Sequence, residues 1–228
     1  MIKDNIAEEF NAFSKNYTED MTRCVPHYLE LLNHFKKHIP KDFHPKHILD
    51  LGCGNGNVTH TLSELFPQAN YTLVDASQDM IDLCKHRFTS LNVNYANSYF
   101  NDFEFNSNKY DMVAAGFSLH HCSTEDKLTI YKKIYNGLKP EGIFTCSDLM
   151  INKNDVEHKE HLKNWKVFVD KNFPDGEKWS WLMEHYNEFD NPNNITNHLH
   201  WLKQAGFRQF SFNAYDNNWT HFKAIKTS

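Results

Sequence analysis

The chain has 228 residues, of which 40% are hydrophobic and 23% charged, so its composition excludes a disordered protein and its length suffices to bury a core. A formal net charge of −5, without a long run of lysines or arginines, argues against a nucleic-acid-binding protein, although a local groove for an RNA loop stays open. No apolar run approaches the length of a membrane-spanning helix, so no membrane partner is expected.

Two further features bear on the compartment. The N-terminal stretch MIKDNIAEEFNAF mixes acids with apolar residues and lacks the apolar centre of a signal peptide. The five cysteines are odd in number, widely spread and free of a C-x-x-C pair, which favours reduced thiols over disulfides or a zinc site. We therefore expect a cytoplasmic protein that works as a monomer or homodimer.

The predicted elements begin with an N-terminal helical segment, residues 1–43, whose longer helix spans 21–39 and starts or kinks at Pro26. From there, short apolar runs that predict strands alternate with amphipathic runs that predict helices. The strands are expected at 46–52, 71–75, 93–97, 110–119 and 142–149, and the helices between them at 57–67, 77–88 and 123–138. Ser77 and Ser123 stand where N-caps are expected.

The last third of the chain departs from this rhythm. Residues 151–190 predict a helical insertion after the fifth strand, and 197–207 predict a further helix. The stretches 208–216 and 218–226 predict two closing strands, the last of them antiparallel. The whole pattern indicates an α/β fold with a Rossmann-like, doubly wound, seven-stranded sheet.

A glycine-rich turn follows the first predicted strand, with Gly52, Gly54 and Gly56 at alternate positions in LGCGNG. Asp75 ends the second strand, 19 positions past Gly56, close to the roughly 20-residue offset of an acid that binds ribose hydroxyls. A dinucleotide fingerprint would place its third glycine where Asn57 stands, and a P-loop would need a lysine. The turn therefore favours a nucleotide ligand without a pyrophosphate, and argues against a nicotinamide oxidoreductase.

Polar residues gather at the ends of the predicted strands, whose bodies are apolar. They are Asp50, Asp75, Asn97, Ser98, Tyr99, His120, His121 and Asp148. In an open parallel sheet, ligands bind outside the carboxyl ends of the strands. We therefore expect these side chains to border one ligand crevice.

Four stretches in this order, ILDLGCGNGNVT, LVDASQDMI, YDMVAAGFSLHH and LKPEGIFTCSD, resemble the successive motifs of the class I S-adenosylmethionine-dependent methyltransferases. The resemblance covers residues 44–150, resumes at WLKQAGF, and implies S-adenosylmethionine as the cofactor. The segments NAFSKNYTEDMTRCVPHY and WLKQAGFRQF resemble small methyltransferases related to the carboxy-S-adenosylmethionine synthases of tRNA wobble-uridine modification.

The resemblance also implies a set of cofactor-binding residues. By position in the motifs, Asp50, Gly52 and Gly54 border the methionine moiety, Asp75 holds the ribose hydroxyls, Ala76 and Met80 pack on the adenine, Phe117 and His120 lie beside the sulfonium, and Tyr17 and Arg23 reach in from the N-terminal helices. Where the family usually has an acidic residue after the third strand, this chain has Ser98 or Tyr99. This adenine contact is therefore either absent or made by the backbone.

Candidates for the reacting groups are His120, His121 and Asp148. Transfer of a methyl group from a sulfonium requires alignment of the partners, exclusion of water and, for a neutral acceptor, a proton acceptor. Each candidate has a structural alternative, because the histidines can serve as structural hydrogen-bonding groups and Asp148 can cap a following helix. A metal held by both histidines with Cys122 would need three or four convergent ligands, which the sequence does not display, so no metal is predicted.

The sequence thus predicts a single-domain methyltransferase, residues 1–228, in which 1–43 and 151–190 form a lid and the acceptor is a small molecule. The aromatic side chains between Trp165 and Phe189 either form core or wall an acceptor pocket. One alternative is a carboxy-S-adenosylmethionine synthase or tRNA-modification enzyme, which needs a cationic residue beside the methyl position. Another is a regulatory protein that binds S-adenosylmethionine without turnover.

Overall fold

The computed structural model describes residues 17–215 and 218–227. Its strands are β1 (His47–Leu51), β2 (Asn70–Asp75), β3 (Asn92–Asn97), β4 (Tyr110–Gly116), β5 (Leu138–Leu149), β6 (Gln209–Tyr215) and β7 (Trp219–Ile225). Its helices are α2 (Tyr17–Cys24), α3 (Tyr28–His34), α4 (Asn57–Ser63), α5 (Gln78–Arg87), the 3-10 helix η2 (Leu119–His121), α6 (Thr124–Gly137), α7 (His158–Asn172), α8 (Glu177–Phe189) and α9 (Ile195–Ala205).

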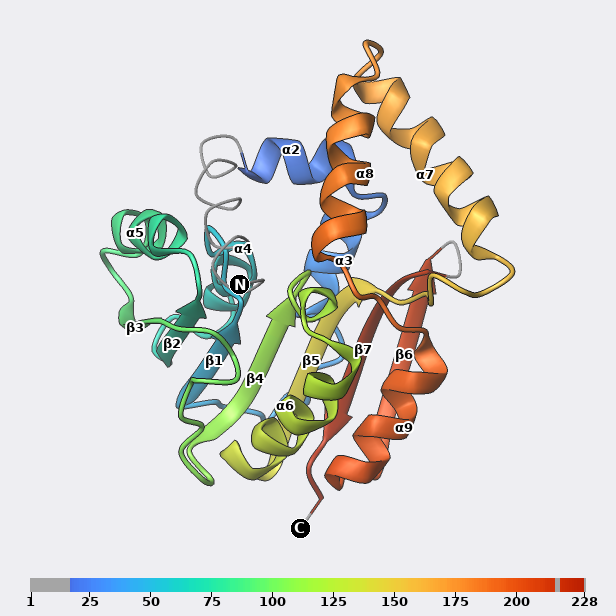
Figure 1. Ribbon diagram of the computed structural model, residues 1–228. Helices are drawn as coiled ribbons and strands as arrows, with labels where there is room; N and C mark the ends of the chain where they lie inside the picture. Colours follow the sequence, from blue (N-terminus) through green and yellow to red (C-terminus); the bar gives the residue numbers. More distant parts are fainter. Residues whose placement is uncertain (1–16, 216–217, 228) are drawn as a thin grey trace.

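The strands form one seven-stranded sheet in the order β3-β2-β1-β4-β5-β7-β6 (Figure 1). The first five pair in parallel, whereas β7 lies antiparallel to both β5 and β6. The predicted doubly wound sheet with an antiparallel last strand is confirmed. The chain order reverses between β1 and β4, which is the switch point where such sheets bind ligands.

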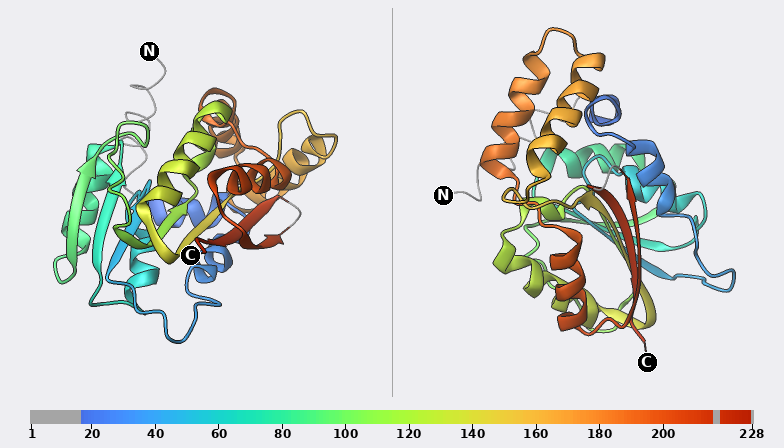
Figure 2. Two further views of the ribbon diagram at one scale, coloured as in Figure 1. Left: turned by 90° about the horizontal axis from the view of Figure 1, so that it is seen from below. Right: turned by 90° about the vertical axis from the view of Figure 1, so that its right-hand side faces the viewer.

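Helices cover both faces of the sheet and bury a separate core on each (Figure 2). One core packs α3, α4 and α5 against the sheet, with fully buried Leu31, Phe35 and Leu62. The other packs α6 and α9, with fully buried Ile134 and Leu202. These two cores fix the carboxyl ends of the strands as a common edge.

The helices α7 and α8 stand beyond this edge, next to α2 (Figure 1). Lys178 of α8 pairs with Asp20 of α2 at 2.7 Å, and the indole nitrogen of Trp165 in α7 donates to the carbonyl of Cys24 at 2.6 Å. The predicted helical insertion is therefore confirmed as two helices, 158–172 and 177–189. Its opening and closing as a lid stays a prediction, as does the assignment of one domain.

Side-chain caps explain where α5 and α6 begin. Ser77 and Ser123 accept hydrogen bonds from the backbone nitrogens of Met80 and Asp126, which confirms both predicted N-caps. The helix expected at 21–39 is broken instead into α2 and α3, because His27 after Pro26 adopts a left-handed conformation with φ 60°. Residues 1–16 of the predicted N-terminal segment lie outside the described residues. No helix within the described ranges is long and apolar enough to cross a membrane.

Candidate functional site

Two cavities open at the carboxyl ends of the strands. The larger, of about 380 Å³, lies between the glycine turn, the end of β2 and the segment that follows α8. The smaller, of about 80 Å³, lies beneath α8 and beside α2. Tyr17, Phe117 and His121 line both cavities. The two cavities therefore share a wall made by these three side chains.

All three glycines of the turn have positive φ values, but the space around each of them differs. A Cβ added to Gly52 would lie 2.4 Å from Cβ of Ser118, and one added to Gly56 would lie 2.3 Å from the ring of Phe88. At Gly54 the nearest atoms belong to the ring of Tyr17, at an ordinary contact distance of 3.6 Å. Packing within the protein explains Gly52 and Gly56, and Gly54 lies open to the larger cavity.

Asp75 organises the turn from the end of β2. Its two carboxylate oxygens accept hydrogen bonds from the backbone nitrogens of Gly54 at 2.8 Å and Ser77 at 2.9 Å. Burial raises the pKa of this carboxyl, and the backbone donors oppose that effect because they stabilise the charged form. A carboxylate offers about four lone-pair sites, and the backbone donors, Ala76 among them, leave at least one site for a hydrogen bond from a ligand in the larger cavity.

Most of the predicted cofactor residues meet at the larger cavity. They are Tyr17, Gly52, Gly54, Asp75, Ala76, Met80, Tyr99 and Phe117. Ser98 lies next to them but outside the lining, and its hydroxyl donates to the carbonyl of Tyr99. Phe100, Asn101 and Asn191, which no sequence motif marks as site residues, also line this cavity.

Asp50 is fully buried beneath the turn rather than exposed to either cavity. One of its oxygens accepts hydrogen bonds from the backbone nitrogen of Thr59 at 3.1 Å and from the Thr59 hydroxyl at 2.6 Å. Burial raises the pKa of Asp50 to about 7, against these hydrogen bonds. The structure therefore gives Asp50 a role in holding the first turn of α4, and its predicted contact with the cofactor stays a prediction.

Arg23 lies outside the lining of both cavities. Its guanidinium donates to the carbonyl of Asn172 and stacks over the ring of Phe173, with 3.9 Å from its central carbon to the ring centroid. Arg23 thus ties α2 to the end of α7, and its predicted contact with the cofactor stays a prediction.

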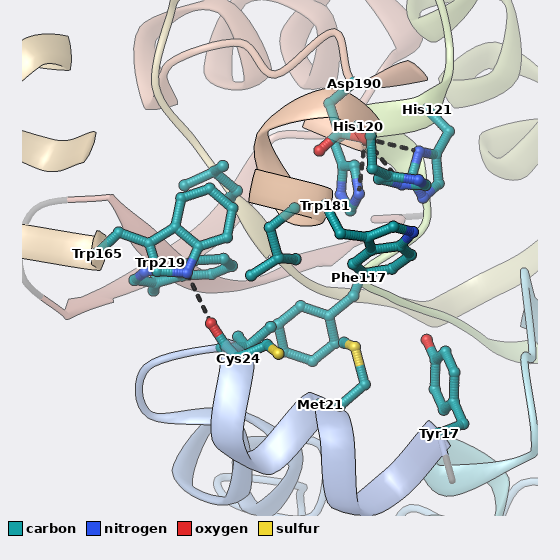
Figure 3. A pocket seen from close by; sticks show the side chains of 14 residues that line it. Tyr17, Met21, Cys24, Phe117, His120, His121, Trp165, Trp181, Asp190 and Trp219 are labelled. Carbon is teal, nitrogen blue, oxygen red and sulfur yellow. Dashed lines mark hydrogen bonds and ion pairs between the residues drawn. The ribbon is translucent and has the colours of Figure 1, made fainter. Parts of the chain in front are cut away.

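Phe117 follows β4 with φ 54°, a left-handed conformation that costs a bulky residue free energy. Its backbone nitrogen donates to the carbonyl of Ser147 at 2.7 Å, and its ring packs against Tyr28 with centroids 5.0 Å apart. These contacts hold the strained residue in place. Its ring lines both cavities, and Figure 3 shows it among the side chains of the smaller one.

The smaller cavity has an apolar body and one polar end (Figure 3). Trp165 and Trp219 meet edge to face, with centroids 5.5 Å apart, near Met21 and Cys24 of α2. At the polar end lie His120, His121, His185 and Asp190. A small ligand with an apolar part and one polar group fits this arrangement.

The three predicted reacting groups differ in position. His120 and His121 lie in η2 at the cavity, whereas Asp148 is fully buried behind them at the end of β5. One oxygen of Asp148 bonds Nδ1 of His120, and its other oxygen accepts from the His120 backbone nitrogen at 3.1 Å. Asp148 therefore orients His120 and does not reach either cavity.

Charges at the polar end act in opposite directions on the histidines. Burial disfavours the imidazolium of His120, but the carboxylates of Asp148 and Asp190 outweigh burial and raise its pKa. Burial lowers the pKa of His121, helped by His120, and lowers that of His185 to about 4. The cluster therefore holds one imidazole that favours a proton beside two that remain neutral.

His185 and Asp190 were not predicted as site residues from the sequence. His185 lies on α8 and Asp190 directly follows it, far in sequence from the two histidines of η2. Their nearness depends on how α8 docks over the sheet, and the only signal in the sequence was the aromatic pattern of the predicted insertion. Cys122, considered as a metal ligand with the two histidines, lines the larger cavity instead.

The larger cavity has the features that an adenosyl cofactor requires. Asp75 offers acceptors at the end of β2, as a ribose diol needs, and Gly54 leaves space beside it. Apolar side chains, including Met80, Phe100 and Ile130, supply surfaces for an adenine ring. Tyr17, Phe117 and His121 mark the end of the cavity that faces the second one.

Comparison with known proteins gives a consistent result. Residues 48–142 match a family model described as a methyltransferase domain. A malonyl-[acyl-carrier protein] O-methyltransferase from Acetivibrio thermocellus is 29% identical over 58% of this chain and 46% of its own length. A carboxy-S-adenosyl-L-methionine synthase from Shewanella loihica is 27% identical over 86% of this chain and 82% of its own. The chain thus spans less than half of the first relative and most of the second.

Solved structures share the fold at low sequence identity. A methyltransferase crystallised with the Haloferax volcanii Trm112 activator superimposes with a TM-score of 0.69 and 15% identity, over 96% of this chain and 98% of its own. Human N-acetylserotonin methyltransferase in complex with S-adenosylmethionine superimposes with a TM-score of 0.64 and 16% identity, over 97% of this chain and 57% of its own.

Proposed function

Because the chain belongs to the class I S-adenosylmethionine-dependent methyltransferases, with S-adenosylmethionine as its cofactor, we propose that it methylates a small molecule bound in the smaller cavity. The observation that carries this proposal is the wall shared by the two cavities, made by Tyr17, Phe117 and His121. The cofactor occupies the larger cavity, with its ribose on Asp75 and its sulfonium at this wall.

The acceptor is a compact molecule with an aromatic or apolar part. Its ring or chain lies between Trp165, Trp181 and Trp219, and its nucleophilic atom points to the polar end with His120 and His121. In this arrangement the protein aligns the acceptor with the methyl group and excludes water. The lid helices contribute by covering the cavity, since Trp181 and Leu182 belong to α8.

A second candidate is a carboxy-S-adenosylmethionine synthase, which the coverage of the Shewanella loihica relative favours. Such an activity needs a cation beside the methyl position to hold the added carboxylate. Among the described residues that line either cavity there is no lysine or arginine, and Arg23 is engaged with Asn172 and Phe173. The site chemistry therefore supports methyl transfer better.

Two measurements test the proposal. Mass spectrometry of the ligand extracted from the purified protein distinguishes S-adenosylmethionine and S-adenosylhomocysteine from a carboxylated form. Release of S-adenosylhomocysteine is then followed across a panel of small phenols, amines and carboxylates. Recovery of the carboxylated cofactor would overturn the methyl-transfer assignment, and cofactor binding without turnover of any acceptor would favour a regulatory protein.

A further inference from the structure

The polar end of the smaller cavity gathers more imidazoles around one carboxylate oxygen than hydrogen bonding accounts for. Three imidazole nitrogens approach one oxygen, Oδ1 of Asp190: Nδ1 of His121 at 3.0 Å, Nε2 of His185 at 3.6 Å and Nε2 of His120 at 3.7 Å. His121 is the hydrogen-bonding partner of this buried carboxylate. The nitrogens of His185 and His120 face the same oxygen from beyond hydrogen-bonding distance.

Two of these separations, 3.6 and 3.7 Å, are close to those between ligands that surround a common ion, and the third, 3.0 Å, is shorter. Zinc binds histidine nitrogen and carboxylate oxygen at about 2.0–2.2 Å, which places neighbouring ligand atoms of a tetrahedral site about 3.3–3.6 Å apart. Ligand atoms of His120, His121 and Asp190 all lie within 4.8 Å of one another. These three side chains come from two segments, η2 and the end of α8, that meet only in the folded protein.

The surroundings of the cluster have the features of a metal site. Asp148 holds Nδ1 of His120, and a carboxylate on the far nitrogen of an imidazole is the usual way to orient a metal-binding histidine. The side chains of His120, His121, His185 and Asp190 are only 12%, 14%, 13% and 7% exposed. Trp181 stacks on His185, with centroids 5.7 Å apart.

We propose that His120, His121 and Asp190 bind a divalent transition-metal ion of the zinc class, with an open fourth position, His185 beside them and Asp148 as the residue that positions His120. The mixed nitrogen and oxygen donor set favours such an ion over magnesium or calcium. This site departs from the sequence prediction of no metal, because one of its donors, Asp190, lies on the insertion. Metal binding does not depend on the proposed function.

The test is titration of the metal-stripped full-length protein with ZnCl₂ by calorimetry, together with metal content by mass spectrometry. We expect one tight site per chain in the wild type. His121→Ala and Asp190→Asn should each weaken it about 100-fold or more, and Asp148→Asn, which leaves all ligands in place, about 10–100-fold. His86→Ala and His200→Ala, at two exposed histidines, should leave the affinity unchanged.

A spectroscopic measurement, combined with thermal unfolding, distinguishes a lost metal site from a variant that folds poorly. Co²⁺ added to the wild type should give the intense visible absorption of a four-coordinate site, and His185→Ala should change that spectrum while thermal unfolding confirms a folded protein. Equal zinc affinity of the wild type and His121→Ala, or a Co²⁺ spectrum of the free aqueous ion, would overturn the proposal. Binding of S-adenosylmethionine, measured separately on the same preparations, reports on the proposed function independently.

Discussion

The replacement of Asp75 by asparagine isolates the contribution of one carboxylate to cofactor binding. In the wild type both oxygens of Asp75 accept backbone hydrogen bonds, from Gly54 and Ser77, and in our proposal the carboxylate also accepts one from a ribose hydroxyl. Asparagine keeps the shape but offers one oxygen and one NH₂ group. The NH₂ group would face a backbone N–H donor and could no longer accept from either the backbone or the ribose.

The expected loss of cofactor affinity in Asp75→Asn follows from the lost hydrogen bond to the ribose. A hydrogen bond to a charged group contributes about 1.5–3 kcal/mol net, and 1.4 kcal/mol corresponds to a factor of ten in affinity. We therefore expect Asp75→Asn to raise the dissociation constant of S-adenosylmethionine about 10–100-fold. Disturbance of the turn around Gly54 adds to the loss.

Isothermal titration calorimetry with S-adenosylmethionine and S-adenosylhomocysteine measures this change. The matched control is Asp79→Asn, an exposed acid in the first turn of α5 that lines neither cavity, and it should bind the cofactor like the wild type. An unchanged affinity in Asp75→Asn, or an equal loss in Asp79→Asn, would refute the assignment of Asp75 to the ribose.

Three further outcomes are expected. Gly52→Ala should lower the free energy of unfolding, measured by chemical denaturation, by about 2–4 kcal/mol, since its Cβ would clash with Ser118. Gly54→Ala should lower it by only about 1–2 kcal/mol. Equal losses in the two variants would contradict the reasoning. Trp181→Ala should raise KM for the acceptor about tenfold or more without altering cofactor affinity, whereas Trp179→Ala, outside both cavities, serves as control. Burial raises the pKa of Asp50 in the folded state to about 7, against its ordinary 3.8. The folded state therefore holds a proton that the unfolded chain releases, and the free energy of unfolding of the wild type falls as the pH rises from about 4 to about 7. The stability of Asp50→Asn relative to the wild type should increase by a few kcal/mol over that range, and a constant difference would show that burial does not raise this pKa.

The elements and their order could be predicted because each depends on local chemistry. Alternation of apolar runs located the strands, and the serines at 77 and 123 marked the helix starts that the structure confirms. Asn57, the departure from a dinucleotide fingerprint, also gains a physical reason. Its side-chain amide donates to the Tyr28 hydroxyl at 2.8 Å and accepts from Arg87 at 2.8 Å, so it joins three helices where a glycine could not.

The part of the site that could not be predicted depends on docking between distant segments. Asp148 and His120 both lie at strand ends, and the sequence identified them, but it could not show that one is buried behind the other. His185 and Asp190 belong to an insertion whose placement is set by contacts such as Lys178 with Asp20. No local pattern reports such contacts, and so the polar end of the smaller cavity appears only in three dimensions.

The position of α7 and α8 in the chain has a consequence for how this fold diversifies. Both helices are inserted between β5 and α9, and they supply Trp165, Trp181 and His185 to the smaller cavity. The glycine turn and Asp75 come from a different part of the chain and keep their own hydrogen bonds. If the acceptor binds as we propose, replacement of this one segment, during evolution or in the laboratory, would therefore give a descendant a new acceptor while it inherited the same methyl donor.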